Sequence, residues 1–274
     1  MKEQVFIYLI VLMGLLGCQR NERKLADELL KRIEYSFEHK KYNTAKLQID
    51  SLNLLYRHRV ELRRVADNYL YKIEQAEVER NLAYFSEQIP KKKLKLDSMS
   101  HYFTLEKNEL VQDLGGYVYK GTRRNSNQTF LKAQVDESGQ IFLTSVYYDG
   151  SACSSQSVKL QSGDYFVLSS MVEPDDEIYG YSFSGEKSNW RILPLSEKES
   201  EKLAHFVSVY YNDDILVSLA GNDCHSNYIL DEGQKEAIRE SYYLSLILKE
   251  IKELKSNTEN SKKQLALIKQ KITG

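Results

Sequence analysis

Two cysteines and one histidine are the side chains best suited to covalent chemistry in the body of the chain. Cys153 follows Gly-Ser-Ala, and His225 stands directly beside Cys224. A thiol nucleophile needs a base within hydrogen-bond reach, whereas neighbours in a strand point to opposite faces of the sheet. The residues after Cys153 favour loop and strand, without the helix that a catalytic cysteine usually caps. We therefore expect no catalytic residue, and a thiol hydrolase is the remote alternative.

Metal and cofactor chemistry is not indicated either. The chain has neither a His-Glu-x-x-His nor a Cys-x-x-Cys spacing. The acidic run 173–177 lacks the glycine and the alternation of a calcium loop, so a solvated turn is expected there. We predict no metal and no cofactor. The five histidines are His39, His58, His101, His205 and His225.

Aromatic residues in the middle of the chain offer a different chemistry, because stacked rings bind sugars and peptides. Sheet aromatics are more often core residues or cross-strand pairs. A ligand- or glycan-binding platform is therefore the alternative hypothesis. Its members would be Tyr147, Tyr148, Tyr179, Tyr181 and Trp190.

The composition of the chain and the positions of its glycines indicate which kinds of element hold these residues. The 274 residues carry 38 Lys and Arg against 39 Asp and Glu, so no global field attracts nucleic acid. From Cys18 to Leu114 there is no glycine and a single proline, Pro90, while ten of the 13 glycines lie between Gly115 and Gly233. Glycine marks turns, so the chain divides into a helical region and a turn-rich region.

The first residues have the pattern of an export signal. Lys2 is followed by an uncharged apolar stretch from Val5 to Leu16. This stretch is too short to cross a bilayer, which takes roughly 20 residues, and it suits the apolar core of a signal peptide. The sequence predicts a signal peptide over residues 1–17, with an uncleaved apolar anchor as the alternative.

The stretch Leu15-Leu16-Gly17-Cys18 resembles the lipobox of bacterial lipoproteins. The resemblance implies cleavage before Cys18, a diacylglyceryl thioether on its sulfur, and usually a further acyl chain such as palmitate on its amine. Two or more chains hold a protein stably to a bilayer. Residues 18–22 would then be a lipidated linker.

The resemblance also bears on location. Residues 19–22 contain no acidic run and no Asp directly after the cysteine. The resemblance therefore implies that the protein lies in the cell envelope, at the outer membrane and facing the periplasm. That compartment is oxidising, and Cys153 and Cys224 can pair in it. Closure of a loop of about 70 residues would contribute roughly 4 kcal/mol. Two buried free thiols are the alternative.

Apolar spacing predicts helices over 23–113. Leu25, Leu29, Ile33 and Phe37 repeat every four residues. We expect a break near 39–43, a second helix to about 56, and a third over 60–89. Pro90 should break that helix or open a further one toward Phe103.

Two stretches in this region resemble a family of uncharacterised Gram-negative envelope lipoproteins. They are Tyr-Asn-x-Ala-Lys-x-x-Ile-Asp-Ser over 42–51 and Ile-Glu-x-x-Glu-x-x-Arg-x-Leu-Ala-Tyr over 73–84. The resemblance implies helical flanks around a central β region. It brings no known activity.

Short runs of alternating apolar residues fill the β-rich region, 114–230. Turn residues separate them about every ten positions, which is typical of an antiparallel sandwich. Ser196 and Glu199 form a capping box that predicts a short helix. The region is acidic, with 9 Lys and Arg against 15 Asp and Glu over 115–230. The predicted strands are 117–120, 129–135, 141–148, 157–160, 165–169, 178–183, 190–193 and 215–219.

The last segment, 231–274, has the strictest periodicity, a heptad seam that predicts one long coiled-coil helix. We expect it to pack on the helix over 60–89, with a second copy of the chain as the alternative partner. The expected fold class is α+β, a helical hairpin stalk with an inserted β-sandwich-like domain. The seam is Leu244, Ile247, Ile251, Leu254, Thr258, Ser261, Leu265, Ile268 and Ile272.

Together these features predict a membrane-anchored envelope lipoprotein with a non-enzymatic scaffold role. Its expected partners are the membrane, through the lipid on Cys18, and a protein of the envelope. Nucleic acid is not expected as a partner. The alternative function is a ligand- or glycan-binding module on the same anchor.

Overall fold

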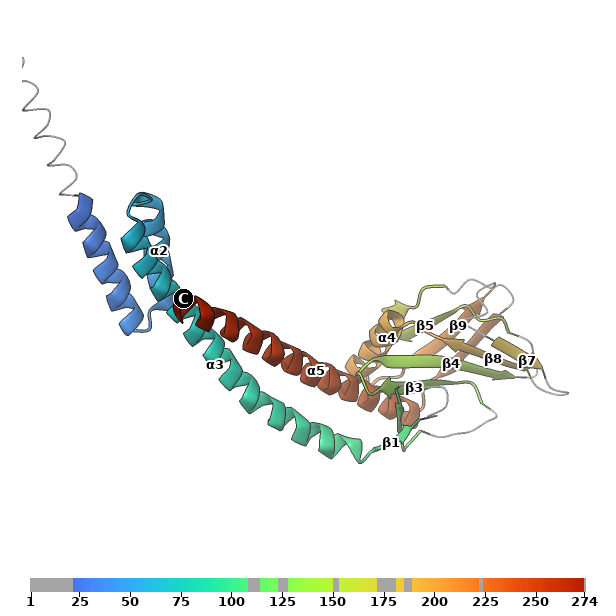
Figure 1. Ribbon diagram of the computed structural model, residues 1–274. Helices are drawn as coiled ribbons and strands as arrows, with labels where there is room; N and C mark the ends of the chain where they lie inside the picture. Colours follow the sequence, from blue (N-terminus) through green and yellow to red (C-terminus); the bar gives the residue numbers. More distant parts are fainter. Residues whose placement is uncertain are drawn as a thin grey trace, which may run out of the picture. The chain divides into compact units, whose positions relative to one another are not determined.

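The computed structural model describes residues 22–107, 114–122, 128–149, 153–171, 181–184, 189–221 and 224–273. The predicted signal peptide and Cys18 lie outside the described residues. The chain divides into two compact units, residues 1–87 with 256–274 and residues 88–255. Two long helices, α3 (Val60–Ser100) and α5 (Glu232–Thr273), contribute to both units (Figure 1).

The first unit is helical. A helix over 22–38, α2 (Tyr42–Leu55) and the first part of α3 bury one apolar cluster. Lys40 ends the first helix in the left-handed conformation, with φ of 55°. Its amide donates to Phe37 O at 2.9 Å and the next amide donates to Ser36 O at 2.8 Å, which satisfies the last carbonyls of the helix. The buried members of the cluster are Ile33, Ala45, Ile49, Leu52, Ala66 and Ile73.

The predicted break at Pro90 is wrong, because α3 continues through it to Ser100. A proline inside a helix removes one hydrogen bond and bends the helix. The residues that follow are mostly lysine and leucine, which are strong helix formers. In the second unit, Lys92 also forms an ion pair with Glu250 of α5. These factors outweigh the local cost of the proline.

Two antiparallel sheets make up most of the second unit. The six-stranded sheet has the order β1-β2-β3-β4-β8-β7, and the four-stranded sheet has the order β10-β9-β5-β6. The strands of the first are β1 (Phe103–Glu106), β2 (Gly116–Tyr119), β3 (Phe130–Asp136), β4 (Ile141–Asp149), β7 (Tyr181–Ser184) and β8 (Asn189–Pro194). Those of the second are β5 (Ser157–Ser162), β6 (Tyr165–Leu168), β9 (Leu216–Gly221) and β10 (Cys224–Ile229).

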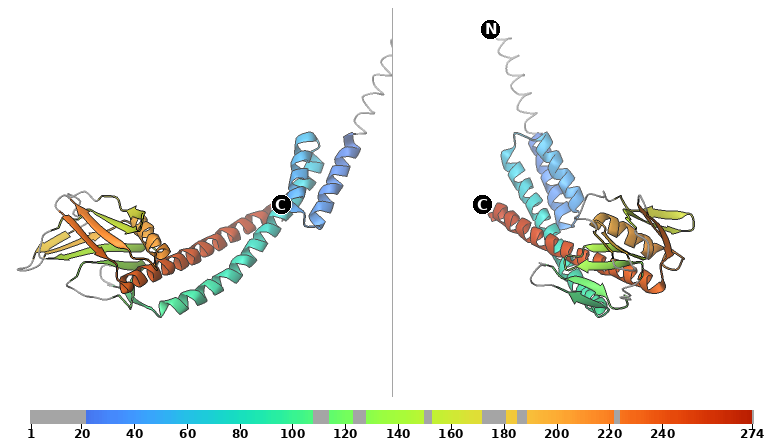
Figure 2. Two further views of the ribbon diagram at one scale, coloured as in Figure 1. Left: turned by 180° about the vertical axis from the view of Figure 1, so that it is seen from behind. Right: turned by 90° about the vertical axis from the view of Figure 1, so that its right-hand side faces the viewer.

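Both sheets share one core with α4 (Glu197–Val209) and the first part of α5. Leu143 of β4, Val217 of β9, Leu203 of α4 and Leu244 of α5 are all buried in it. Figures 1 and 2 show α4 beside the strands. The predicted cap is confirmed, since Ser196 Oγ accepts a hydrogen bond from Glu199 N at 3.4 Å. The α+β fold class is likewise confirmed, with long helices on both sides of the β region in the sequence.

Two strands were not predicted. Phe103 begins β1, although the periodicity assigned it to the helical region 23–113. Its spacing of four from Met99 also fits a helix, so periodicity misplaced this boundary. β10 was missed because Cys-His-Ser-Asn is not rich in β-branched residues. Its pairing with β9 along six residues overrides that weak propensity.

The heptad seam lies on the buried side of α5. Leu244, Ile247 and Ile251 are buried in the second unit and Ile268 is buried in the first. Within the first unit, Lys271 Nζ lies 5.2 Å from the ring centroid of Tyr71 on α3. The predicted packing of this helix against residues 60–89 thus has a direct contact, and the coiled-coil geometry stays a prediction.

Candidate functional site

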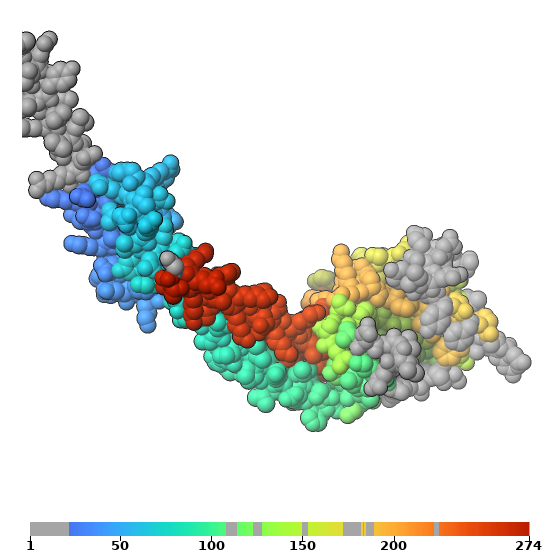
Figure 3. All heavy atoms as spheres, viewed as in Figure 1, coloured from blue at the N-terminus to red at the C-terminus, as the bar shows by residue number. Residues whose placement is uncertain are grey.

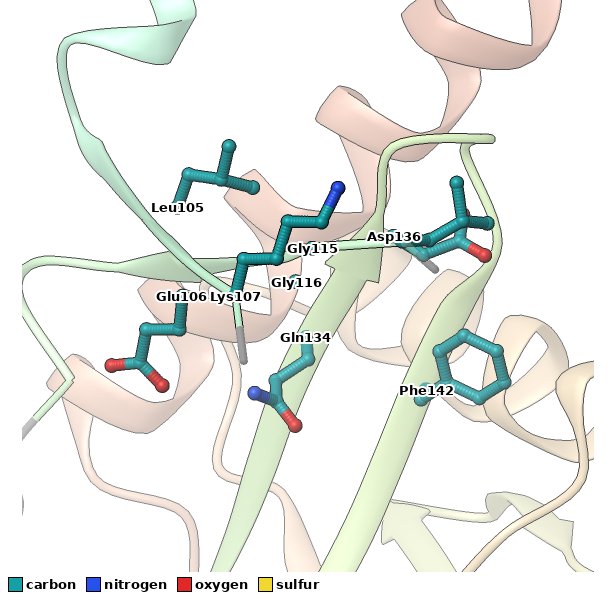
Figure 4. Close-up of a pocket in the computed structure, with 9 residues that line it drawn as sticks. Leu105, Glu106, Lys107, Gly115, Gly116, Gln134, Asp136 and Phe142 are labelled. Atoms are coloured by element: carbon teal, nitrogen blue, oxygen red, sulfur yellow. The ribbon is translucent and has the colours of Figure 1, made fainter. Parts of the chain in front are cut away.

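A hollow of about 630 Å³ opens on the outer face of the six-stranded sheet. Strands β1 to β4 all contribute to it, and Figure 4 shows the side chains around it. The green residues of these strands reach the surface in the space-filling view (Figure 3). The lining residues are Leu105, Glu106, Lys107, Leu114, Gly115, Gly116, Gln134, Asp136 and Phe142.

Two glycines at the start of β2 make room for this groove. A Cβ on Gly115 would lie 2.7 Å from Leu105 Cδ1, and one on Gly116 would lie 3.6 Å from Gln134 Nε2. Alternation along the strands places Gln134 and Phe142 on the outer face, side by side in the β3–β4 register. The groove therefore presents one amide and one ring.

The β3–β4 turn closes one end of the groove, and its backbone amides bind the carboxylate of Asp136. Asp136 Oδ1 accepts hydrogen bonds from the amides of Ser138 and Gln140, both at 2.8 Å. An aspartate bonded in this way stabilises its own turn. Asp136 is thus a structural group, with its acceptor directed at the backbone.

Glu137 ties the same turn to the β1–β2 side. Its Oε2 accepts from Gly115 N at 2.8 Å and lies 3.7 Å from Lys107 Nζ. Burial, and then the charge of Glu137, raises the pKa of Tyr117 in β2. The cation of the groove is therefore already neutralised by a protein carboxylate.

The described lining residues combine one amide, one ring and three charged side chains, those of Glu106, Lys107 and Asp136. Among the lining residues that the structure describes there is no Ser, Thr, Cys or His, so no hydroxyl, thiol or imidazole is found there. The volume of the groove falls within the range of small-molecule sites, which span roughly 300 to 1,000 Å³. Sequence reasoning missed it because its members come from four strands, and the Gly115-Gly116 pair was its only local signal.

The predicted thiol residues do not form a catalytic pair in the described part of the chain. Cys153 is buried and disulfide-bonded, so it carries no thiolate. His225 is exposed on β10, opposite Ala220 of β9. The side chain of Cys224 lies outside the described atoms, and its bond to Cys153 stays a prediction.

The histidines are scattered over both units. His39 and His101 each have a ring nitrogen within 2.8 Å of a carbonyl one helical turn earlier. His58 Nε2 lies 2.9 Å from Glu22 Oε1, and the ring of His205 is tilted against that of Tyr242, with centroids 5.7 Å apart. Across the residues that the structure describes, no group of three His, Cys, Asp or Glu could hold a metal ion. The acidic run 173–177 lies outside those residues.

The predicted aromatic platform is only partly assembled. Tyr147 is buried in the core, which removes it from any exposed surface. Tyr148 and Trp190 are half-buried neighbours with ring centroids 4.6 Å apart. Tyr179 and the side chain of Tyr181 lie outside the described part. The most exposed rings in the described part of the second unit are instead Tyr165 and Phe166 of β6.

Comparison with protein-family models, curated proteins and solved structures found no match. Among the described helices, none is long and apolar enough to cross a membrane.

Proposed function

We propose that the chain is a lipid-anchored protein of the cell envelope with a non-enzymatic interaction role. The observation that carries the proposal is Leu15-Leu16-Gly17-Cys18, directly after an uncharged apolar stretch. Acyl chains on Cys18 would hold the protein at a bilayer surface, with a stabilisation of about 0.8 kcal/mol per buried CH₂. The outer membrane, facing the periplasm, is the proposed location.

Features of the described structure support the interaction role. The disulfide at Cys153 is compatible with an oxidising compartment. The groove beside β1 presents the amide of Gln134 and the ring of Phe142, and the four-stranded sheet exposes large apolar side chains such as Phe166 and Ile229. Exposed apolar surface of this kind is typical of sites that bind another protein.

The anchor is tested by intact-mass analysis of the full chain and of a Cys18→Ser variant, both expressed in a Gram-negative host. We expect the wild-type protein to begin at residue 18 with diacylglyceryl and acyl groups attached. The Cys18→Ser variant should keep residues 1–17 and carry no lipid. A Cys224→Ser variant is the matched control, since it also removes one thiol and should still be lipidated.

An unmodified Cys18 in the wild-type protein would overturn the proposal. So would a Cys18→Ser protein that carries the same lipid mass as the wild type. Crosslinking in intact cells then tests the interaction role. Recovery of monomer alone would contradict a scaffold.

A ligand-binding module is the second candidate, favoured by the 630 Å³ groove and by the Tyr148–Trp190 pair. Trp190 is the only tryptophan of the chain, so its fluorescence reports directly on ligand contact. Titration with N-acetylglucosamine oligomers should change the emission if the pair binds sugar, and a Tyr148→Ala variant should abolish the change. An unchanged emission spectrum would count against glycan binding there.

A further inference from the structure

Among the residues that the structure describes, no strand pairs with the outer side of β6, which is an edge of the four-stranded sheet. It pairs with β5 on one side and is the last strand in the order β10-β9-β5-β6. Natural edge strands are usually protected by charged residues, proline or a bulge. The four residues of β6 are Tyr-Phe-Val-Leu, and three of them are exposed, Tyr165 by 65%, Phe166 by 62% and Leu168 by 48%.

The backbone of this edge has hydrogen-bonding groups available. Ser169 N donates to Val158 O of β5 at 2.9 Å. In an antiparallel pair, bonded and non-bonded residues alternate, so Val167 and Tyr165 also direct their backbone groups to β5. The N–H and C=O groups of Phe166 and Leu168 therefore point to the open side, where a further strand would bond them.

Apolar residues, interrupted by Gln161, run from this edge across the outer face of the sheet. Phe166 lies opposite Gln161 of β5, Gln161 opposite Leu216 of β9, and Leu216 opposite Ile229 of β10. Leu216 is 37% exposed and Ile229 is 58% exposed. Lys159 Nζ lies 4.8 Å from the ring centroid of Phe166. An added strand would lie directly beside β6, where its side chains would contact the exposed Phe166 and Leu168.

Carboxylates gather at the Tyr165 end of the strand. A hollow of about 610 Å³ there is lined by Asp164, Asp213 and Asp214, together with the stacked rings of Tyr165 and Tyr210. Within the described residues no ion pair involves these three carboxylates. The nearby Lys235 donates to the backbone oxygen of Asp213 and pairs with Glu232 instead. The negative charge at this end is complementary to a basic group on an occupant.

We propose that β6 binds an extended segment of a second protein, which adds a strand to the sheet and places a Lys or Arg at the Tyr165 end. Main-chain hydrogen bonds would supply the binding, and Phe166, Leu168 and the three carboxylates would supply the selectivity. This proposal rests on the interaction role above and names the chemistry of the partner.

The test uses the full chain in detergent and a labelled, acetylated peptide amide, Lys-Val-Thr-Val-Thr-Lys, with affinity read from fluorescence anisotropy. Because the peptide has a lysine at each end, one lysine lies at the Tyr165 end whether the peptide pairs parallel or antiparallel to β6. We expect saturable binding, which a central Thr-to-Pro change abolishes because proline blocks main-chain pairing. Replacing both lysines by glutamate should weaken binding by about tenfold or more through like-charge repulsion.

Protein variants locate the site. Phe166→Lys should weaken peptide binding by about tenfold or more, because a charged side chain, lysine above all, protects an edge strand from pairing. The double variant Asp213→Asn/Asp214→Asn should weaken it by about three- to tenfold. Leu54→Lys, at an apolar residue of α2 that is equally exposed, is the matched control and should bind as the wild type does. Circular dichroism confirms that each variant is folded.

The proposal is overturned if no peptide binds, or if Phe166→Lys binds like the wild type. It is also overturned if sedimentation shows a dimer that Phe166→Lys dissociates, because the edge would then serve a second copy of this chain. Either result leaves lipidation of Cys18 untouched. Conversely, an unlipidated Cys18 would refute the anchor while peptide binding at β6 still stood.

Discussion

The hydroxyl of Ser245 on α5 donates a 2.6 Å hydrogen bond to the carbonyl oxygen of Gly139 in the β3–β4 turn. Ser245 is buried, and the same turn forms one end of the groove through Asp136. The contact joins residues 106 positions apart, so it fixes the groove to α5. Loss of this hydrogen bond should lower the free energy of unfolding of the whole second unit.

Ser245→Ala should lower the free energy of unfolding by about 1 to 3 kcal/mol, because it leaves a buried carbonyl without its donor. Trp190 in β8 reports the unfolding of this unit by fluorescence in urea. Ser208→Ala in α4 of the same unit is the matched control, since the Ser208 hydroxyl donates the same kind of bond to His205 O in an exposed setting. Equal effects of the two substitutions would contradict the assigned role of Ser245.

Gly139 and Gly163 both have positive φ, at 90° and 55°, but differ in their surroundings. A Cβ on Gly139 would lie 2.9 Å from Lys249 N of α5, whereas one on Gly163 meets nothing within 4 Å. Gly163→Ala should therefore destabilise by about 1 to 2 kcal/mol through backbone strain alone.

Gly139→Ala adds an overlap with a helix backbone and should destabilise by about 1 to 3 kcal/mol more than Gly163→Ala does. Urea unfolding followed through Trp190 measures both variants. A smaller effect at Gly139 than at Gly163 would show that the turn and α5 are not in contact as described.

Lys40 is the one non-glycine residue with positive φ in the described part of the chain. Lys40→Gly should stabilise the helical unit by about 1 kcal/mol, because glycine adopts this conformation without a Cβ clash. Slower amide hydrogen exchange in the helix over 22–38 and in α2 would report the gain. Lys41→Gly is the control; with φ of −83°, that residue has no strain to relieve, so stability should not rise.

Tyr119 makes stability depend on pH in the alkaline range. Burial, and then a hydrogen bond to Glu236, raises its pKa to about 12, against roughly 10 in an unfolded chain. The folded state keeps this proton where the unfolded state loses it. Its contribution to stability is therefore complete below pH 10 and is lost as the pH rises through 12.

Urea unfolding at pH 9, 10.5 and 12 measures this dependence. The stability difference between the wild type and Tyr119→Phe should shrink as the pH rises over that range. Tyr84→Phe, at an exposed tyrosine of α3, should follow the wild type. A constant difference between the wild type and Tyr119→Phe would refute the assignment.

Local signals in the sequence predicted the elements whose cause is itself local. Ser196 and Glu199 predicted the start of α4, and alternation predicted β3 and β4 almost to the residue. The prediction of a break at Pro90 was wrong because the helix is stabilised by residues beyond the immediate neighbours of the proline. These are the helix formers on both sides and the Lys92–Glu250 ion pair.

The binding surfaces were harder to predict for the same reason. The groove depends on strand order, which brings Leu105, Gln134 and Phe142 together from three strands. The run Tyr-Phe-Val-Leu over 165–168 predicted a strand but not its edge position. A strand made only of apolar residues can lie inside a sheet with both faces buried, or at an edge with one face exposed. The order β10-β9-β5-β6, which the sequence does not reveal, places this strand at the edge.

The partner of Cys153 is the last prediction. The backbone after Cys153 lies against β9: Gln156 N donates to Ala220 O at 2.8 Å, and a Cβ on Gly221 would overlap Ser154 O. Gly221 in turn lies opposite Cys224 in the β9–β10 register. Mass spectrometry of the unreduced protein should therefore recover the peptides of Cys153 and Cys224 joined by a disulfide.

Replacing both cysteines by serine should lower the free energy of unfolding by about 4 kcal/mol, because the closed loop holds about 70 residues. Urea unfolding through Trp190 measures this loss, and reduction of the wild type should reproduce it. Cys18→Ser should leave the bridge intact. A bond from Cys153 to Cys18 would contradict the bridge and the lipid anchor together, since a thioether to lipid leaves no sulfur to pair.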